Sequence, residues 1–204
     1  MSAKFAPSKG RYFGQKMLSE QRHRTTSKRL QGRGFTLLEL LVTLVILSIV
    51  LGAGVPAMLD IARTTRLQGA AQESYALLQY ARSDALRSGQ ERFVVWTQDA
   101  GNWCAVVSST NDCNCLTTDC SIDGILRQQS SADFTGVTLA SAAFTGGSYT
   151  RFDAMRGLAE GNAGTVTYQL LDDGVVDAEV RVIVSVLGRL RFCQIGDVGG
   201  HPSC

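Results

Sequence analysis

The sequence predicts an α+β protein, in which one long N-terminal helix is followed by a head of antiparallel β-strands. Three observations support this fold class. Residues 35–59 form an apolar run, residues 60–88 repeat apolar residues at spacings of three and four, and from Glu91 the pattern alternates with a period of two. We therefore expect four segments: a basic segment at 1–34, an apolar helix at 35–59, its amphipathic continuation at 60–89 and a β-sheet head at 90–204.

The apolar run begins abruptly at Phe35 and contains one charged residue, Glu39, before Leu59. At about 1.5 Å per residue, its 25 residues form a helix of roughly 37 Å, which exceeds the hydrocarbon core of a bilayer at about 30 Å. An ordinary secretory signal is the alternative, but such a signal has a shorter apolar core followed by a small-residue cleavage site. We therefore expect a membrane-spanning helix.

Charge is distributed unevenly along the chain. Residues 1–34 contain nine Lys or Arg and one acidic residue, whereas the remainder has eleven Arg, no Lys and seventeen acidic residues. A basic flank before a membrane helix favours a cytoplasmic N-terminus and an exported C-terminal side. Nucleic-acid binding by the basic segment is the alternative, but its position directly before the apolar run favours the topological explanation.

The residues Gly34-Phe35-Thr36-Leu37-Leu38-Glu39 closely resemble the processing site of type IV prepilins and type II secretion pseudopilins. The resemblance implies that a prepilin peptidase cleaves between Gly34 and Phe35, and that the new amine of Phe35 is N-methylated. It also implies that Glu39 pairs with the Phe35 amine of a neighbouring subunit in a filament. Pro56 is residue 22 counted from Phe35, where pilins commonly carry a helix-bending proline.

Glu39 has a simpler alternative explanation. A carboxylate inside a membrane helix costs about 3 kcal/mol and usually has a partner. A carboxylate near the helix end could instead reach the lipid headgroups. The resemblance favours a buried pair with an amine.

The second half of the helix has one apolar face. That face consists of Leu67, Ala70, Ala71, Ser74, Leu77, Leu78, Ala81 and Ala85. We expect it to pack against the head and Gly89 to end the helix in a left-handed C-cap. The segment Ala81-Arg82-Ser83-Asp84-Ala85-Leu86 resembles the GspH/FimT branch of the pseudopilins, which includes FimU-like minor pilins.

The head is expected to be all β, with two packed sheets or one strongly curved sheet. The turns are expected at 99–102, at 172–174 and at 187–188, with an irregular Gly-rich stretch at 151–164. The predicted strands are Arg92–Gln98, Trp103–Ser108, Gly124–Gln129, Gly136–Ala140, Ala143–Thr150, Thr165–Leu171, Glu179–Leu187 and Arg189–Gln194.

All six cysteines follow the apolar run, on the side that we expect to be exported, where disulfides persist. The most local pairing is Cys193 with Cys204. Cys104, Cys113, Cys115 and Cys120 would form two further bridges, and Cys113 and Cys115 are too close to pair easily. A zinc site is the alternative, but these four lack the paired Cys-x2-Cys spacing and no histidine lies near them.

No constellation of residues indicates catalysis, and we expect no cofactor or metal. His23 lies in the basic segment and His201 in the C-terminal tail, where we expect it to be solvated. Neither has a nucleophile and an orienting carboxylate in a recognisable arrangement. Asp172 and Asp173 lack the remaining oxygen ligands of a calcium loop, and turn formation explains them.

The last strand carries two arginines, Arg189 and Arg191, two residues apart and therefore on one face. Guanidinium groups so placed suit phosphate contacts. The sequence Gly188-Arg189-Leu190-Arg191 also resembles the C-terminal motif of FimT-type minor pilins, which is linked to DNA binding during uptake. A solvated strand face is the alternative, and the acidic balance of residues 35–204 argues against a broad nucleic-acid footprint.

We therefore expect a minor pilin or pseudopilin that is not an enzyme. It would sit in the bacterial inner membrane with a periplasmic head, and then enter a pilus or pseudopilus as an initiating or capping subunit. Its partners would be the prepilin peptidase, other major or minor pilins and DNA. The alternatives are a GspH-like pseudopilin of type II secretion, an unassembled membrane-anchored periplasmic binding module and, more distantly, an exported hydrolase.

Overall fold

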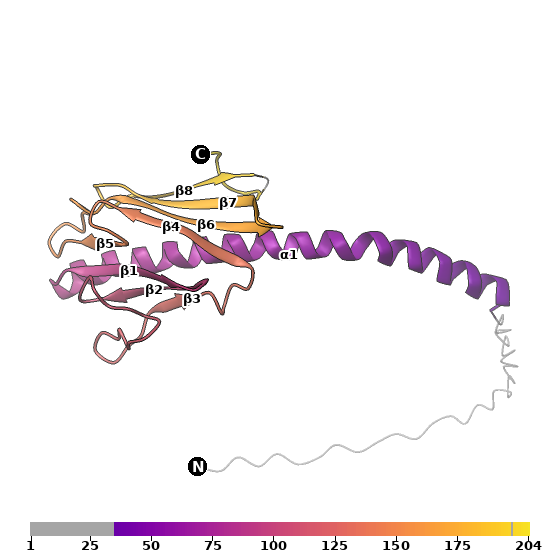
Figure 1. Ribbon diagram of the computed structural model, residues 1–204, viewed down its shortest axis with the longest axis horizontal. Helices are drawn as coiled ribbons and strands as arrows, with labels where there is room; N and C mark the ends of the chain where they lie inside the picture. Colours follow the sequence, from indigo (N-terminus) through magenta and orange to yellow (C-terminus); the bar gives the residue numbers. More distant parts are fainter. Residues whose placement is uncertain (1–34, 197) are drawn as a thin grey trace, which may run out of the picture. The chain divides into compact units, whose positions relative to one another are not determined.

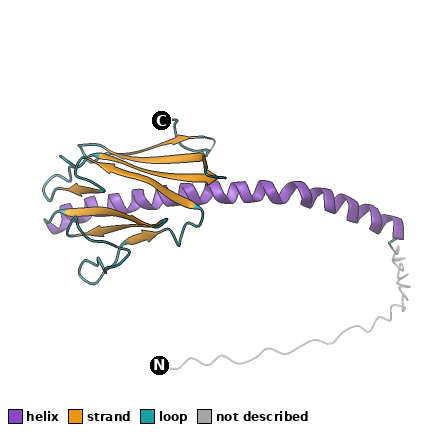
Figure 2. Ribbon diagram, viewed as in Figure 1, coloured by secondary structure: helices purple, strands orange, loops and turns teal. Residues whose placement is uncertain are grey.

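The computed structural model describes residues 35–196 and 198–204 of the chain, so Gly34 and the rest of the basic segment lie outside it. One helix is followed by eight strands, and every strand pairing in the two sheets is antiparallel. Figures 1 and 2 show the C-terminal part of the helix running alongside both groups of strands. The predicted α+β fold is confirmed.

Helix α1 extends over Leu37–Ser88 and begins where Thr36 caps it. The backbone N–H of Glu39 donates to Thr36 Oγ1 at 3.2 Å, and the N–H of Leu40 donates to the Thr36 carbonyl at 3.1 Å. The spacing Thr-x-x-Glu is that of a capping box, and it places the Glu39 carboxylate in the first turn, where the helix dipole favours it. The helix ends as expected at Gly89, whose φ of 65° is left-handed.

By its internal contacts the chain divides into two units, residues 1–44 and residues 45–204. Every described side chain from Phe35 to Arg63 is exposed, and most of these side chains are apolar. Within the part of the chain that the structure describes, no helix has both the length and the apolarity needed to cross a membrane.

The strands form two four-stranded sheets. The first has the order β3-β2-β1-β5 and the second the order β4-β6-β7-β8. The strands are β1 (Arg92–Asp99), β2 (Asn102–Ser108), β3 (Gln128–Ser130), β4 (Val137–Phe144), β5 (Tyr149–Phe152), β6 (Gly164–Asp172), β7 (Val175–Val184) and β8 (Leu190–Ile195). Of the two alternatives left open by the sequence, two sheets or one curved sheet, the structure has two sheets.

The larger of two hydrophobic clusters packs the helix against both sheets. All eight residues of the predicted apolar face of α1 are buried, from Leu67 to Ala85. They meet Trp96 and Trp103 of the first sheet, and Tyr168 and Val180 of the second. The period-3.6 pattern of the helix therefore positions both sheets around one helical face.

A buried hydrogen-bond network lies within this core. The Tyr168 hydroxyl accepts from Trp96 Nε1 at 3.0 Å and from Gln129 Nε2 at 2.7 Å, and it shares a hydrogen bond with Ser74 Oγ at 2.6 Å. Gln129 Nε2 also donates to Ser74 Oγ at 2.6 Å. Burial raises the pKa of Tyr168 above its ordinary value, so the phenol stays protonated. The network ties α1 to both sheets.

Two of the predicted strands are wrong, one in its limits and the other in its existence. The predicted strand at 124–129 is reduced to β3, because Asp123 and Gly124 take positive φ and form a tight turn bridged by Ile122 and Ile125. The predicted strand at 143–150 does not exist: β4 runs to Phe144 through a bulge after Leu139, and β5 starts at Tyr149. The β4–β5 turn contains Gly146 and Gly147, which the alternating pattern concealed.

Smaller shifts occur elsewhere. Residues 151–152, expected to be irregular, belong to β5, and Val175 to Ala178, expected to lie outside a strand, begin β7. β7 starts early because Asp173 and Gly174, both with positive φ, make a two-residue turn. It also ends at Val184 instead of Leu187, since Ser185 begins the next loop.

Candidate functional sites

The N-terminal candidate site is the start of α1. Phe35 precedes the helix and is 79% exposed, and Glu39 is exposed in the first turn. Pro56 lies within α1, but the structure does not describe its side chain. Gly34, which precedes the predicted cleavage site, lies outside the described residues. An exposed carboxylate one turn into an apolar helix is available to a cation from outside this chain. Thr36 is the residue that sequence reasoning missed, although the Thr-x-x-Glu spacing signals it.

The second candidate site is the arginine loop, residues 185–189, together with Arg191 of β8. Arg189 lies one residue before β8, and both Arg189 and Arg191 are exposed. Leu190 and Phe192, which alternate with them, pack against the core. The two guanidinium groups therefore leave the sheet on its outer face.

Backbone hydrogen bonds define the shape of the arginine loop. The Ser185 N–H donates to the Arg189 carbonyl at 2.9 Å, the Arg189 N–H donates to Ser185 Oγ at 3.0 Å, and the Gly188 N–H donates to the Ser185 carbonyl at 2.8 Å. Gly188 has a φ of 70°, and a Cβ there would stand 2.4 Å from the Gly157 carbonyl oxygen. Only glycine both adopts this positive φ without strain and leaves room for the Gly157 carbonyl oxygen.

Arg181 of β7 is a third cation on this face, and the sequence analysis did not single it out. It pairs across the ladder with Cys193, while Ile183 pairs with Arg191. Arg181 and Arg191 line one shallow groove together with Thr165 of β6 and the tail residues Pro202–Cys204. Arg181 also donates to Glu179, so its charge is partly neutralised. The alternation of β7 could have revealed this placement once Arg191 was assigned to the outer face.

The C-terminal tail forms one wall of the groove. A disulfide joins Cys193 to Cys204, the most local pairing expected from the sequence. The Gln194 N–H donates to the Pro202 carbonyl at 2.9 Å and the Cys204 N–H donates to the Gln194 carbonyl at 3.1 Å, so the tail pairs with the edge of β8. His201 is not fully solvated as expected, because its ring stacks on Phe192 with 4.7 Å between centroids.

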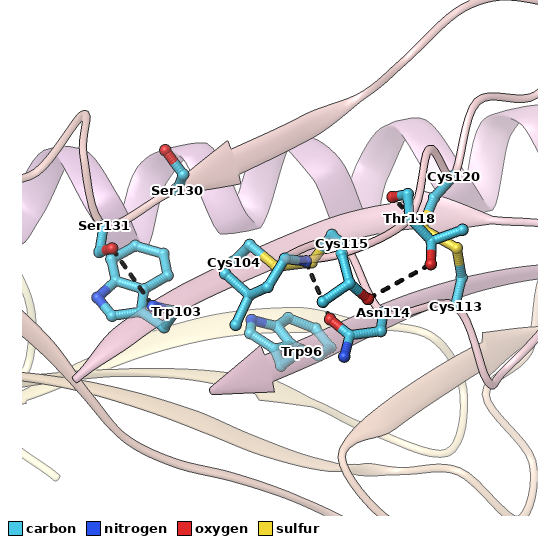
Figure 3. The surroundings of a disulfide bond; sticks show 12 residues. Trp96, Trp103, Cys104, Cys113, Asn114, Cys115, Thr118, Cys120, Ser130 and Ser131 are labelled. Carbon is cyan, nitrogen blue, oxygen red and sulfur yellow. Dashed lines mark hydrogen bonds between the residues drawn. A yellow bond between two sulfur atoms is a disulfide. The ribbon is translucent and has the colours of Figure 1, made fainter. Parts of the chain in front are cut away.

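The other four cysteines form two bridges across the loop between β2 and β3, Cys104–Cys115 and Cys113–Cys120 (Figure 3). Within this loop Asn114 accepts from the backbone N–H groups of Leu116 and Thr118. All six cysteines are therefore paired in disulfides, as the sequence analysis expected in preference to a zinc site. Among the described residues no His, Cys, Asp or Glu group has the arrangement of a metal site.

Asp84, the acidic residue of the Ala-Arg-Ser-Asp segment, has a structural role. Its carboxylate accepts from Arg87 at 2.8 Å and from the buried Arg92 at 2.6 Å. Hydrogen bonds from Arg87 and Arg92 hold the pKa of Asp84 below its ordinary value. The pair joins the end of α1 to the start of β1.

The start of the chain and the head together define a pilin-like protein, because each matches a family model of that class. Residues 30–55 match the prokaryotic N-terminal methylation motif, which includes Gly34, Phe35 and Glu39. Residues 70–188, more than half of the chain, match the family described as type II transport protein GspH. The chain belongs to the GspH family, and as a pilin-like protein it is a structural subunit, not an enzyme.

Solved structures similar to this chain include two crystal forms of the type IV minor pilin FimU from Pseudomonas aeruginosa strain PAO1. Both are 23% identical and cover 62% of this chain, with 91% and 87% of the FimU chains covered and TM-scores of 0.40 and 0.39. No curated protein matches the chain.

Proposed function

We propose that this chain is a minor pilin that initiates or caps a type IV pilus, and that its helix α1 forms the contact with other subunits. The observation that supports this proposal is the exposure of every described apolar side chain between Leu37 and Ile61. A helix that is apolar on all sides needs an apolar environment, which neighbouring pilin helices or lipid provide. Before assembly, residues 35–59 would anchor the chain in the inner membrane with the head in the periplasm.

Processing prepares this contact. A prepilin peptidase would cleave after Gly34, and methylation would follow on the amine of Phe35. Glu39 would then accept a charge-assisted hydrogen bond from the Phe35 amine of the next subunit, which removes the cost of an unpaired carboxylate in apolar surroundings. Exposure of both residues in the single chain supports an intermolecular pair.

The test is Glu39→Gln, which keeps the shape of the side chain and removes its charge. We expect the variant to be expressed and processed normally but to enter sheared filaments at least tenfold less. Asp60→Asn is the matched control, because Asp60 is an exposed acid on the same helix beyond the apolar run. Normal incorporation of Glu39→Gln would refute the proposed pair.

The same contact would serve a pseudopilus of type II secretion, the alternative role within this class. Deletion of the gene separates the two roles. Loss of surface pili with normal protein export supports the pilus, and loss of export with normal pili supports the secretion system. An unassembled periplasmic binding module predicts neither loss.

DNA binding during uptake is the second function that we propose, at Arg189 and Arg191. The supporting observation is that both side chains are exposed on the outer face of the second sheet, beside a groove that also contains Arg181. Phosphate contacts by such arginines need no base recognition. The ligand would be duplex or single-stranded DNA, bound through its backbone.

This proposal is tested by DNA retardation with the chain lacking residues 1–34, because their nine basic residues would retain DNA by themselves. We expect binding that weakens with salt and that Arg189→Ala with Arg191→Ala abolishes. In the wild-type chain, two phosphate contacts should contribute about 1.8 to the slope of log affinity against log salt concentration. The double variant Arg63→Ala with Arg66→Ala is the control, because it removes the same amount of charge from outside the proposed site. No retardation of DNA at low salt would end the proposal.

A further inference from the structure

We propose that Arg82 of helix α1 is a positioning residue that holds the arginine loop in its binding shape, an inference that rests on the proposed DNA contact. Arg82 Nε donates to the Gly157 carbonyl at 2.9 Å, and Arg82 Nη1 donates to the Gly188 carbonyl at 3.0 Å. One guanidinium group therefore bonds to two loops that are far apart in the sequence.

The first of these loops, the Asp153 loop (residues 153–159), is organised by a carboxylate. Asp153 Oδ1 accepts from the backbone N–H groups of Met155 at 2.8 Å and Arg156 at 2.6 Å, and Oδ2 accepts from that of Leu158 at 2.8 Å. These hydrogen bonds, with that from Arg156 the strongest, hold the pKa of Asp153 below its ordinary value. The loop thus has a defined shape of its own.

The two loops contact each other as well as Arg82. The Ala159 N–H donates to the Val186 carbonyl at 3.0 Å. A Cβ on Gly157 would stand 3.1 Å from Arg82 Nε, and one on Gly188 would stand 3.2 Å from the same atom. The glycines allow both backbones to approach the guanidinium group, which is half-buried between them.

This arrangement brings together two sequence motifs that are far apart in the chain. Arg82 belongs to the Ala-Arg-Ser-Asp segment of α1, and Gly188 directly precedes Arg189. A planar guanidinium group donates in several fixed directions, whereas the ammonium group of lysine is a point charge. Arg82 therefore fixes the backbone from which Arg189 leaves the sheet, and a ligand meets a loop that is already ordered.

The test compares Arg82→Lys with the wild-type chain, both lacking residues 1–34 and kept in non-ionic detergent. The matched control is Arg66→Lys, because Arg66 lies on the same helix and donates to one loop carbonyl, that of Thr135, at 3.4 Å. Limited trypsin digestion reports on each loop separately, since Arg156 and Arg189 are cleavage sites within them. Arg127 is an exposed site outside both loops.

We expect Arg82→Lys to accelerate cleavage after Arg156 and Arg189 roughly tenfold and to leave cleavage after Arg127 unchanged, because hydrogen bonds to a charged group are lost in the two loops alone. DNA affinity should fall roughly tenfold with an unchanged salt slope, since Arg189 and Arg191 still reach phosphates. Arg66→Lys should behave as wild type.

The other outcomes separate the two proposals. Unchanged cleavage after Arg156 and Arg189, or equal acceleration after Arg127, would overturn the positioning role. Accelerated cleavage in both loops with unchanged DNA affinity would overturn the link between Arg82 and the ligand. Accelerated cleavage together with a wild-type chain that retains no DNA would refute DNA binding and leave the loop-holding role of Arg82 supported.

Discussion

Replacement of Tyr168 by Phe tests the network at the centre of the head. The change removes one hydroxyl group and leaves the ring in place. Trp96 Nε1, whose side chain is buried, loses its acceptor at 3.0 Å, which costs about 1–3 kcal/mol. The lost hydrogen bond with Ser74 adds about 1 kcal/mol, whereas Gln129 keeps its contact with Ser74.

The variant should therefore lose about 3 kcal/mol of unfolding free energy, a large part of the roughly 5–15 kcal/mol that stabilises a typical domain. For a head of this size it corresponds to a decrease in Tm of about 10 °C. Tryptophan fluorescence of the detergent-solubilised chain reports selectively on unfolding of the head, because both tryptophans, Trp96 and Trp103, lie there.

Tyr75→Phe is the matched control. The Tyr75 hydroxyl accepts only an exposed hydrogen bond, from Gln79 at 3.0 Å, and its ring stacks on Phe192. This variant should lose less than about 0.5 kcal/mol. Equal Tm values for Tyr168→Phe and wild type would refute the idea that the network stabilises the head.

Alkaline pH provides an independent check on the same hydroxyl. Burial raises the folded-state pKa of Tyr168, so its contribution to stability is complete below the unfolded pKa and is lost as pH rises above about 10. Tyr168→Phe should show a smaller alkaline loss of stability than wild type. If Tyr168→Phe and wild type lost the same stability at alkaline pH, the loss would come from groups other than the Tyr168 hydroxyl.

Contacts outside the Tyr168 network also stabilise the head. Asp84→Asn should cost about 3–5 kcal/mol, because Arg92 is left buried and unpaired. Since the folded-state pKa of Asp84 is lowered, wild type should lose stability as pH falls below about 4, and the variant should lose less, as measured by unfolding at pH 3 and pH 7. Cys193→Ser with Cys204→Ser should lose about 2.8 kcal/mol for a separation of 11 residues, and the Gln194 amide should exchange faster. Gly188→Ala places a Cβ 2.4 Å from the Gly157 carbonyl oxygen, and it should accelerate tryptic cleavage after Arg189 without unfolding the head.

The sequence was informative where one physical requirement dominates. The apolar face of α1 was predicted residue by residue, because a helix of fixed period must bury one stripe. The hairpin turns at Ala100-Gly101 and Asp173-Gly174 were predicted because positive φ favours few residues. The presence of disulfides followed from the placement of all six cysteines after the apolar run.

The errors arose where local pattern does not determine pairing. The bulge in β4 after Leu139 shifts the alternation, so one strand was divided and a turn was missed. The roles of Arg82 and Arg181 depend on which loops and strands lie side by side, which no local pattern specifies. Thr36, by contrast, could have been predicted from its spacing to Glu39.

The mature N-terminus of the protein in cells that assemble it tests its role as a filament subunit most directly. Mass spectrometry of the N-terminal peptide should find a chain that starts at N-methylated Phe35, both in the membrane fraction and in sheared filaments. A chain that retains residues 1–34 in both fractions would contradict processing, and with it the intermolecular pair between Phe35 and Glu39.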